Sequence, residues 1–202
     1  MTGFDQLTLD FYAGQATEYL GHRPEHINRE LVDFLPLLSP GARILELGCG
    51  GGTDAAYMIE QGFDVDPTDG VAAMARAAEE RLGRPVRVMR FDELDAVEDY
   101  HAVIANASLL HVPSGDLSDI LERIWRALKP GGWHLATYKT DDAPGYDEHG
   151  RYYNYLSRAD ADVQYRAAGA WAAIDYAEFP GTGYFSKASQ WLKITACKEG
   201  ST

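Results

Sequence analysis

The sequence predicts an α/β fold in which helices cover both faces of a doubly wound sheet that is mostly parallel. Two observations carry this prediction. Residues 41–140 alternate short apolar runs with longer stretches of helical periodicity, which is typical of βαβ units, and the first apolar run, 43–47, passes directly into a cluster of glycines. A chain of 202 residues is long enough for one such domain and short for two. We therefore expect a single domain, 1–202.

Five strands, with helices between them, should form the centre of this sheet. We expect the strands at 43–47, 63–68, 86–90, 101–106 and 133–138, and the helices at 53–61, 71–82 and 118–128. The run Lys129-Pro130-Gly131-Gly132 should end the last helix before the fifth strand, because proline and glycine disfavour a continuing helix. Pro67 should mark where pairing of the second strand stops, because proline has no N–H to donate.

The segments on either side of residues 41–140 should complete the fold. One helical stripe in the first 40 residues joins Leu9, Tyr12, Ala16 and Tyr19. We expect a second helix at 24–35. The N-terminal helices of residues 1–40 should then cap the sheet. After residue 140 we expect a helix at 159–168. Two strands at 171–178 and 190–197 should close the sheet as an antiparallel pair, which gives it an antiparallel C-terminal strand.

The acidic composition bears on possible partners. The formal net charge is −13, and no cluster of Lys and Arg interrupts the acidity. A chain with this charge repels phosphate backbones and anionic lipid surfaces. We therefore expect neither nucleic acid nor a membrane as a partner.

The cysteines and the hydropathy pattern bear on location. Cys49 and Cys197 are far apart and outside any metal-ligand spacing, which favours a reducing compartment and no metal site. The N-terminus lacks the apolar segment of a signal peptide, and no run of about 18 apolar residues occurs. We expect a cytoplasmic protein.

The strongest functional signal is the stretch ILELGCGGG at 44–52, an apolar strand that leads into glycines. Glycine lets the backbone turn tightly and leaves no side chain between main-chain N–H groups and a ligand. The spacing Gly50-x-Gly52-x-x-Ala55 also fits the looser dinucleotide motif, so the turn alone does not select the ligand. Glu46, at the tip of the strand, would repel a pyrophosphate but attract an ammonium group, directly or through water. The turn therefore favours a cationic ligand without phosphates.

Two further acids follow later strands. Asp69 comes 19 residues after Gly50, at the end of the second strand, where a carboxylate can accept both ribose hydroxyls of a nucleoside. Phe91 and Asp92 follow the third strand, where the ring can flank an adenine and the acid can bind its amino group. Asp92 is also a candidate N-cap for a helix that begins at Glu93, and both roles can hold.

These features occur together in one family. The sequence resembles class I S-adenosylmethionine-dependent methyltransferases of the small-molecule type, whose fold is Rossmann-like. The stretches that carry the resemblance are ILELGCGGG, VDPTDG, RFDEL, ANASLLHV and RALKPGGWHLATYK. They cover residues 41–140 in the family's order and spacing, and the resemblance is weaker after Tyr138. Two departures are Pro67 in the second strand and the third consecutive glycine of the turn.

The resemblance implies S-adenosylmethionine as the cofactor and assigns residues to its parts. Glu46, Gly48 and Gly50, with Cys49 between the glycines, would surround the methionine part, and Asp69 would hold the ribose. The remaining positions are Gly70 and Met74 against the adenosine, Asp92 at the adenine, and Asn106 and Ala107 beside the cofactor.

The family's chemistry is an in-line displacement at a methyl group that the sulfonium already activates. The protein must align the nucleophile with the methyl group and exclude water, and the reaction needs no catalytic metal. A base is needed only for a protonated acceptor. His111 is the best candidate, because its unperturbed pKa lies near neutrality. The alternative is a structural histidine held by hydrogen bonds in its loop.

Aromatic residues on both flanks of residues 41–140 are candidates for the acceptor pocket. By the resemblance, the N-terminal helices cover the cofactor and residues 141–202 shape the acceptor side. We therefore hypothesise that Tyr12 and Tyr19, with Arg151, Tyr152 and Tyr153, line a pocket for a small, partly apolar acceptor. Half-buried packing is the alternative for the tyrosines, and Arg151 would either pair with an acceptor carboxylate or form an ordinary salt bridge.

Two other functions stay open at this point. A nicotinamide-dependent oxidoreductase shares the sheet, the glycine turn and the ribose acid, but the strict glycine triple from Gly48 and a Tyr-x-x-x-Lys pair after the fourth strand are missing. A non-catalytic S-adenosylmethionine-binding protein would keep the same motifs. The sequence leaves the acceptor atom open among oxygen, nitrogen, sulfur and a metalloid oxyanion, and it does not give the oligomeric state.

Overall fold

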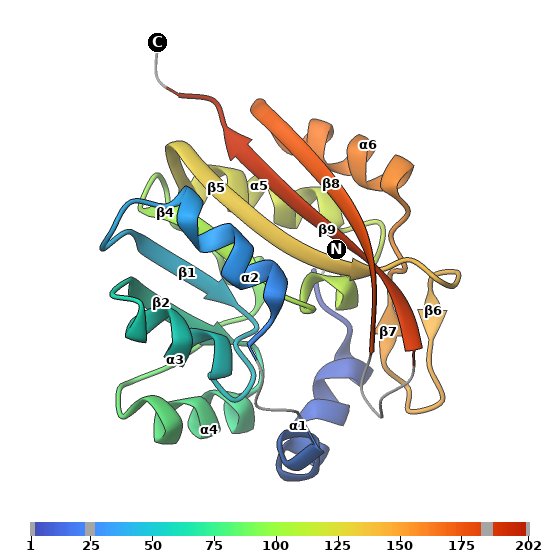
Figure 1. Cartoon of the computed structure of the whole chain (residues 1–202). Helices are drawn as coiled ribbons and strands as arrows, with labels where there is room; N and C mark the ends of the chain where they lie inside the picture. The colour runs from blue at the N-terminus through green and yellow to red at the C-terminus, as the bar shows by residue number, and fades with distance from the viewer. Residues whose placement is uncertain (1–2, 23–26, 183–187, 201–202) are drawn as a thin grey trace.

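The computed structural model describes residues 3–22, 27–182 and 188–200, and its main sheet has seven strands in the order β3-β2-β1-β4-β5-β9-β8 (Figure 1). The strands are β1 (Arg43–Leu47), β2 (Asp64–Asp69), β3 (Arg87–Val88), β4 (Tyr100–Ala105), β5 (Leu128–Lys139), β8 (Trp171–Thr182) and β9 (Ala188–Lys198). Strands β1 to β5 pair in parallel, and β9 is antiparallel to both of its neighbours. The predicted α/β class, with a mostly parallel sheet and an antiparallel C-terminal strand, is confirmed.

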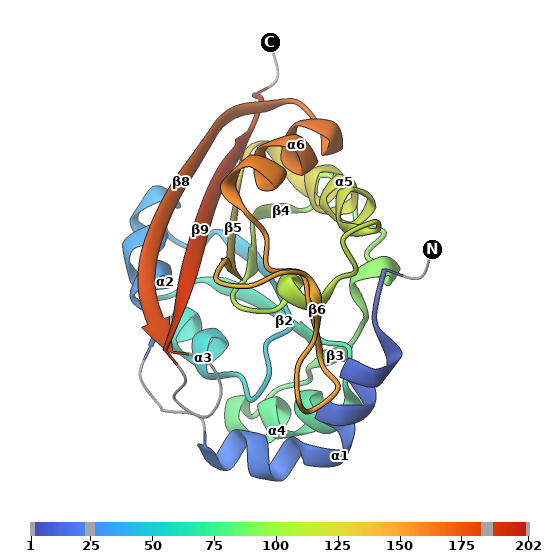
Figure 2. The ribbon, with the colours of Figure 1, turned by 90° about the vertical axis from the view of Figure 1, so that its right-hand side faces the viewer.

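Helices pack on both faces of this sheet, as a doubly wound fold requires. They are α1 (Gln6–His22), α2 (Arg29–Phe34), α3 (Thr53–Glu60), α4 (Ala72–Leu82), α5 (Leu117–Ala127) and α6 (Arg158–Ala168), with the short 3₁₀ helices η1 (Leu35–Leu37), η2 (Phe91–Glu93) and η3 (Leu109–His111). Figure 2 shows α5 and α6 against one face, and α2 and α3 against the other. A separate hairpin of β6 (Gly145–Tyr146) and β7 (Tyr152–Tyr153) lies beside α1.

Helix α5 shows how the sequence pattern produces a layer of the fold. Leu117, Ile120, Leu121 and Ile124 recur at helical spacing, and all four are buried. They belong to one apolar cluster with residues of β4 and β5, among them Val103. Burying a side chain of this size contributes roughly 1.5–3 kcal/mol. The apolar face of the helix therefore holds it on the sheet.

Some element boundaries differ from the sequence prediction. Strand β2 is displaced by one residue from 63–68, and β3 keeps only two residues of 86–90. Strand β8 continues beyond 171–178, because it pairs with β9 as far as Thr182. The second N-terminal helix, expected at 24–35, begins at Arg29, and 23–26 lie outside the described residues.

The start of β5 is a larger correction. The run 129–132 is expected to separate α5 from a strand at 133–138, but it lies inside β5, which begins at Leu128 directly after α5. Leu128 pairs with Tyr100, and the register then shifts before Trp133 pairs with β4. Gly131 has a φ of +75° within this irregularity. The proline and the glycines therefore mark a bulge inside the strand and not a break before it.

Pro67 also lies where pairing continues, contrary to the prediction. It is in register with Glu46 of β1, and β2 extends to Asp69. The carbonyl oxygen of Thr68 accepts N–H groups from the turn after β1, whereas that of Asp69 accepts from Met89 on the β3 side. Because main-chain groups alternate in direction along a strand, the nitrogen of Pro67 faces the β3 side. Pairing with β3 begins only at Thr68, so the missing N–H costs no ladder bond.

None of the helices in the described part of the chain combines the length and the apolar character needed to span a bilayer.

His134 on β5 is a fully buried titratable group that the sequence prediction did not single out. Its ring stacks on Tyr165 of α6 with 5.8 Å between the centroids, and its Nδ1 lies 2.8 Å from the carbonyl oxygen of Val103. A carbonyl only accepts, so Nδ1 carries the proton. Burial lowers the pKa of His134 to about 4, against the opposing effect of the hydrogen bond to Val103. The folded protein holds this histidine neutral.

We expect this burial to make the protein less stable in acid. Between about pH 6.5 and pH 4 the unfolded chain protonates His134 and the folded chain does not, so stability present above pH 6.5 is lost as the pH falls, by up to about 3 kcal/mol. His134→Phe should therefore flatten the pH dependence of the unfolding free energy by about one proton in this range, measured with urea at several pH values. Parallel curves for the two proteins would contradict the assignment, whatever their offset at pH 7.

Candidate functional site

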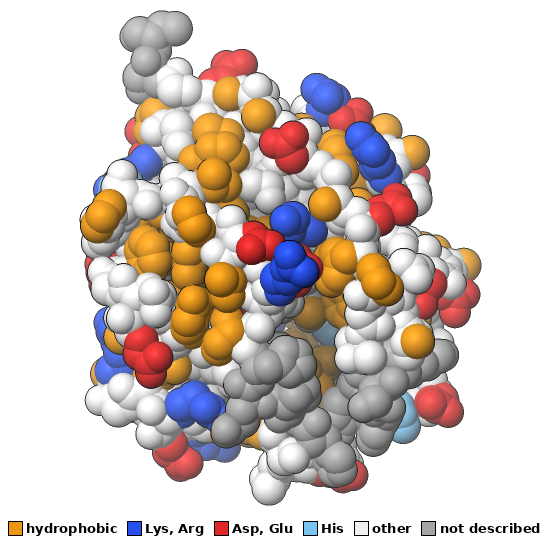
Figure 3. Space-filling model, viewed as in Figure 1, with side chains coloured by type: hydrophobic (Ala, Val, Ile, Leu, Met, Phe, Trp, Pro, Cys, Tyr) orange, Lys and Arg blue, Asp and Glu red, His pale blue; other side chains and the backbone are white. Residues whose placement is uncertain are grey.

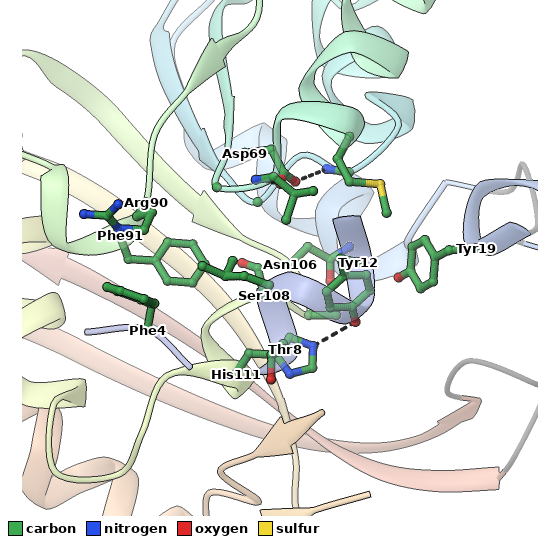
Figure 4. A pocket seen from close by; sticks show the side chains of 17 residues that line it. Phe4, Thr8, Tyr12, Tyr19, Asp69, Arg90, Phe91, Asn106, Ser108 and His111 are labelled. Carbon is green, nitrogen blue, oxygen red and sulfur yellow. Dashed lines mark hydrogen bonds between the residues drawn. The ribbon is translucent and has the colours of Figure 1, made fainter. Parts of the chain in front are cut away.

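A pocket opens at the carboxyl ends of β1, β2 and β4, where open α/β sheets bind their ligands. The pocket is partly open to solvent. Figure 4 shows side chains from four parts of the chain around it. The lining residues are Phe4, Thr8, Leu9, Tyr12 and Tyr19; Gly48 and Gly50; Asp69, Gly70, Val71 and Met74; Arg90 and Phe91; and Asn106, Ala107, Ser108 and His111.

The glycine turn after β1 forms one wall because no side chain fits there. Gly48 has a φ of +76° and Gly50 a φ of +56°, in the left-handed region that favours glycine. A Cβ added to Gly48 would lie 2.6 Å from the Cβ of Ser108. Ser108 is fixed in turn, because its hydroxyl donates to the carbonyl oxygen of Leu47 at 2.6 Å. The bare backbone of the turn is therefore a packing requirement as well as a binding surface.

Asp69 joins this turn to the end of β2. One carboxylate oxygen accepts the N–H of Gly50 at 2.9 Å, and the other accepts the N–H of Val71 at 2.8 Å. The residue is 8% exposed and lines the pocket. Each oxygen has a further lone pair, so the carboxylate can hold the two turns and still accept from a ligand.

A third wall is apolar and lies at the left of Figure 4. Phe91 of η2 and Phe4 of the N-terminal segment both reach the pocket, and the guanidinium of Arg90 lies 4.7 Å from the centroid of the Phe4 ring. Asp92 is not among the lining residues, because its carboxylate is turned to Arg90 Nε at 3.1 Å. The N-cap alternative for Asp92 is wrong: Asp92 is inside η2, whose N-cap is Arg90.

Asn106 to Ser108 form the floor after β4. The amide of Asn106 donates to Asp54 at 2.8 Å, and its carbonyl oxygen accepts from Asn28 and Thr137. Ala107 has a φ of +51°, which is unusual for a residue with a side chain. Its N–H donates to the hydroxyl of Thr137 at 2.8 Å, which fixes the turn. The network holds this floor rigidly below the pocket.

Tyr12, Tyr19 and His111 line the side opposite Asp69 (Figure 4). Nδ1 of His111 lies 2.6 Å from the carbonyl oxygen of Tyr152, and Nε2 lies 2.9 Å from the hydroxyl of Tyr12. The carbonyl can only accept, so Nδ1 is protonated and donates. Nε2 of the neutral ring then accepts the Tyr12 O–H. The geometry thus selects one tautomer of His111.

The burial of this side lowers the basicity of His111. Burial lowers its pKa to about 4, the Tyr152 carbonyl opposes this, and the charge of Arg151 lowers it further. Burial likewise raises the pKa of Tyr12 well above its ordinary value. Both groups are therefore neutral near pH 7 in the protein alone.

Arg151, Tyr152 and Tyr153 lie behind this wall and not on the pocket surface. Arg151 is 4% exposed and binds Asp147, with Nη2 at 2.7 Å from the carboxylate. Its guanidinium lies over the rings of Phe11, Tyr12 and Tyr153, at 4.9–5.9 Å from their centroids. Of the two roles considered for Arg151, an acceptor contact and an ordinary salt bridge, the structure shows the salt bridge.

The pocket therefore unites part of the predicted site. Of the predicted cofactor residues, Gly48, Gly50, Asp69, Gly70, Met74, Asn106 and Ala107 line it, whereas Glu46 and Cys49 are buried beside it and Asp92 is turned away. Lining residues that the sequence argument did not assign are Phe4, Thr8, Val71, Arg90 and Ser108. The sequence argument places Leu9 on the helical stripe of the first 40 residues and gives it no role in the site. Arg90 and Ser108 lie within the stretches RFDEL and ANASLLHV, whereas no local motif marks Phe4 and Thr8, which reach the pocket through packing.

Among the described residues, no group of three His, Cys, Asp or Glu side chains is placed to hold a metal ion.

A family model described as "Methyltransferase domain" matches residues 19–177, which is most of the chain and includes the glycine turn, Asp69 and the floor after β4. The chain belongs to this methyltransferase family. The predicted cofactor, S-adenosylmethionine, is that of the family, and the match does not favour the nicotinamide-dependent alternative.

Curated relatives of this methyltransferase agree with the assignment. The chain is 24% identical over 148 residues to a probable S-adenosyl-L-methionine-dependent methyltransferase TehB of Haemophilus influenzae, with 69% of this chain and 51% of the relative covered. It is 30% identical over 145 residues to a ubiquinone biosynthesis O-methyltransferase of Xanthomonas campestris, with 65% and 60% covered. The chain thus spans about half to three fifths of the length of these relatives.

A solved structure shows the same fold. The 1,6-didemethyltoxoflavin-N1-methyltransferase of Burkholderia thailandensis, with 1,6-didemethyltoxoflavin and S-adenosylhomocysteine bound, is similar at a TM-score of 0.77 and 22% identity. The similarity covers 96% of this chain and 88% of that one. The prediction of a Rossmann-like class I methyltransferase is therefore confirmed.

The walls of the methyltransferase pocket fit the cofactor. Gly48 and Gly50 line the pocket without side chains, so main-chain groups of the turn face an amino-acid tail. Asp69 offers carboxylate oxygens suited to ribose hydroxyls, and Val71, Met74 and Phe91 offer an apolar site for a base. Which residue contacts which part stays a prediction.

We expect Gly48→Ala to impair this site more than Gly41→Ala does. Both glycines have a φ near +75°, so both substitutions carry backbone strain of roughly 1 kcal/mol. Only the Cβ at Gly48 meets another residue, Ser108, whereas nothing lies within 4 Å at Gly41. Gly48→Ala should cost about 1–3 kcal/mol more in the unfolding free energy and weaken S-adenosylhomocysteine binding more than tenfold by calorimetry. Equal losses in the two variants would refute the close approach as the cause.

Proposed function

We propose that this protein transfers a methyl group from S-adenosylmethionine to a small-molecule acceptor by in-line displacement. The observation that supports this is one continuous pocket with two unlike sides. The glycine turn and Asp69 form one side, and Tyr12 and His111 form the other (Figure 4). When bound, the cofactor supplies a methyl group that its sulfonium activates, so the residues of the chain need to align an acceptor and keep water out.

The cofactor side of the proposal rests on charge and shape. Glu46 is 3% exposed behind the glycine turn and favours an ammonium group over a phosphate near it. Asp69 holds the ribose, and Phe91 flanks the adenine. Phe4 closes the same end from the N-terminal segment, and the N–H of Gly3 donates to Asp116 at 3.1 Å beside it.

On the acceptor side, the wall that α1 forms is held by the β6–β7 hairpin, which is far from α1 in sequence. Tyr152 N–H donates to the hydroxyl of Thr8 at 2.8 Å, and the hydroxyl of Tyr146 donates to Asp5 at 2.8 Å. These bonds join α1 to the β6–β7 hairpin over the pocket. A space closed in this way favours a small acceptor over a polymer.

The surface charge is consistent with that choice. The net charge is −13, and on the face that Figure 3 shows, basic side chains are scattered among acidic ones. A nucleic acid acceptor would be attracted by a continuous basic stripe. We therefore keep nucleic acid and membranes out of the proposal. The cytoplasmic location rests on the cysteine pattern alone and stays a prediction.

The decisive experiment measures cofactor binding and methyl transfer separately. We expect S-adenosylhomocysteine to bind by calorimetry, and Asp69→Ala to weaken it about 10- to 100-fold, since a charge-assisted hydrogen bond contributes about 1.5–3 kcal/mol. Asp69→Asn, which keeps a carbonyl acceptor, should lose less. Asp64→Ala, at an exposed position of the same strand, is the matched control and should bind as the native protein does.

Unchanged affinity in Asp69→Ala would refute the ribose assignment. Unfolding curves must accompany it, because Asp69 also holds Gly50 and Val71. Methyl transfer is then followed by mass spectrometry with a broad panel of amines, phenols, thiols and carboxylates. Tight cofactor binding with no product from any of them would favour the non-catalytic alternative.

A second prediction concerns the N-terminal wall. Phe4→Ala removes a ring that lines the pocket, so S-adenosylhomocysteine should bind about 2- to 10-fold more weakly, as expected for one aromatic contact of about 0.5–1.5 kcal/mol. The unfolding free energy should change little. Leu7→Ala is the control, because Leu7 is 57% exposed and outside the pocket. The same affinity in both variants would show that Phe4 does not meet the cofactor.

A further inference from the structure

We propose that the methyl acceptor is an arylamine that is uncharged at neutral pH, and that Tyr12 accepts an N–H group from it. This inference rests on the proposed function and narrows its substrate class. It excludes alcohols and phenols, which must lose a proton before or during methyl transfer.

The first support is the hydrogen bonding of His111. Its Nδ1 proton goes to the carbonyl oxygen of Tyr152, and its Nε2 lone pair is taken by the hydroxyl of Tyr12. A general base needs a lone pair within reach of the acceptor's proton. Here the Nε2 lone pair of His111 accepts the Tyr12 hydroxyl. An acceptor in the pocket therefore contacts Tyr12 and not this lone pair. His111 is therefore a positioning residue for Tyr12.

The second support is the charge around His111. The groups that face it are Asp5 just before α1, Tyr12 from α1, Lys139 from β5, and, from the β6–β7 hairpin, Asp147, Arg151, the Tyr152 carbonyl and the ring of Tyr153 at 4.7 Å between centroids. Burial outweighs the carboxylates and lowers the pKa of His111 to about 4. His111 is therefore a weak acceptor for the proton of a phenol, whose pKa is about 10 in water.

No other lining residue replaces it as a base. Asp69 is the one carboxylate among the described residues that line the pocket, and it lies on the opposite side (Figure 4). Its two oxygens already accept N–H groups from Gly50 and Val71. Tyr12 does not ionise readily, because burial raises the pKa of its hydroxyl well above the ordinary value.

The third support is what Tyr12 and its neighbours present to a ligand. Tyr12 donates its proton to His111, and its oxygen accepts Nη1 of Arg151 at 3.5 Å. The second lone pair of the oxygen is therefore the one that suits an N–H donor in the pocket. The ring of Tyr12 meets Tyr19 edge-on at 5.0 Å and His111 at 5.5 Å between centroids. Such a set of rings favours a flat aromatic partner.

The step balances without a base in the pocket. The nitrogen lone pair forms the bond to the methyl carbon while the carbon–sulfur bond breaks and its electron pair stays on sulfur. The nitrogen then carries the positive charge. The arylamine releases a proton to water after the transfer, which leaves a neutral N-methyl product.

The first test reads the state of His111 directly. In ¹⁵N-labelled protein saturated with S-adenosylhomocysteine, we expect the imidazole signals of His111 to stay those of the neutral Nδ1–H form from pH 8 to pH 5. The signals are assigned by their loss in His111→Gln. Titration with a midpoint at pH 6 or above would overturn the inference.

The second test compares acceptors of one shape. Aniline and phenol, and 1-naphthylamine and 1-naphthol, are matched probes offered with S-adenosylmethionine at pH 7.5. We expect N-methylated products from the nitrogen compounds at rates at least 100-fold above any O-methylated product. Faster methylation of the phenols would overturn the nitrogen class. No product from either series, with S-adenosylhomocysteine still bound, would count against the proposed function, and the acceptor inference would fall with it.

Variants separate positioning from base catalysis. His111→Gln keeps an acceptor for the Tyr12 hydroxyl but cannot take a proton, so we expect kcat to fall less than tenfold, with a pH profile of unchanged shape. Loss of a general base would cost about 10²- to 10⁴-fold. Tyr12→Phe should raise KM for aniline more than it lowers kcat. A fall of 100-fold or more in His111→Gln, with an acid limb near pH 6–7 lost, would show that His111 is the base.

Discussion

The carboxylate of Asp69 is the constraint on which the site depends. It binds the N–H of Gly50 in the turn after β1 and the N–H of Val71 at the start of α4. The carboxylate thereby fixes the distance between the turn after β1 and the turn at the start of α4, at the edge of the sheet where the parallel strands end. The left-handed backbone at Gly48 and the fixed hydroxyl of Ser108 complete this edge from β1 and β4. A nucleoside pocket results because the sheet is parallel, so all these ends meet on one side.

The cover of the pocket depends on contacts between distant parts of the chain. Helix α1 and the β6–β7 hairpin are far apart in sequence, yet Thr8 binds Tyr152 and Asp5 binds Tyr146. Arg151, paired with Asp147 and surrounded by aromatic rings, lies at the centre of this junction. Its charge is neutralised within the junction, which leaves the pocket wall in front of it to neutral groups. The cover therefore sets the electrostatic character of the acceptor side.

Burial acts alike on the two histidines that the fold encloses, and the consequences differ. His134 under α6 and His111 beside the pocket both have a pKa of about 4, and both donate from Nδ1 to a main-chain carbonyl. At His134 the result is a neutral residue in the core. At His111 it is a fixed tautomer whose other nitrogen orients Tyr12. A reaction whose leaving group is already activated needs such orientation more than it needs a base.

The sequence by itself determined the order of elements, the class of the sheet and the residues near the strand ends. Gly48, Gly50 and Asp69 could be named because alternating apolar periods locate strands, and parallel strands place their ends together. Asn106 could be named from the family resemblance. Only the tertiary structure decided the ladder around Pro67, the bulge at 129–132, the turning of Asp92 to Arg90, and the arrival of Phe4 at the pocket. These depend on which side of a strand has a partner, and on contacts between residues distant in sequence. Local periodicity carries no information about either.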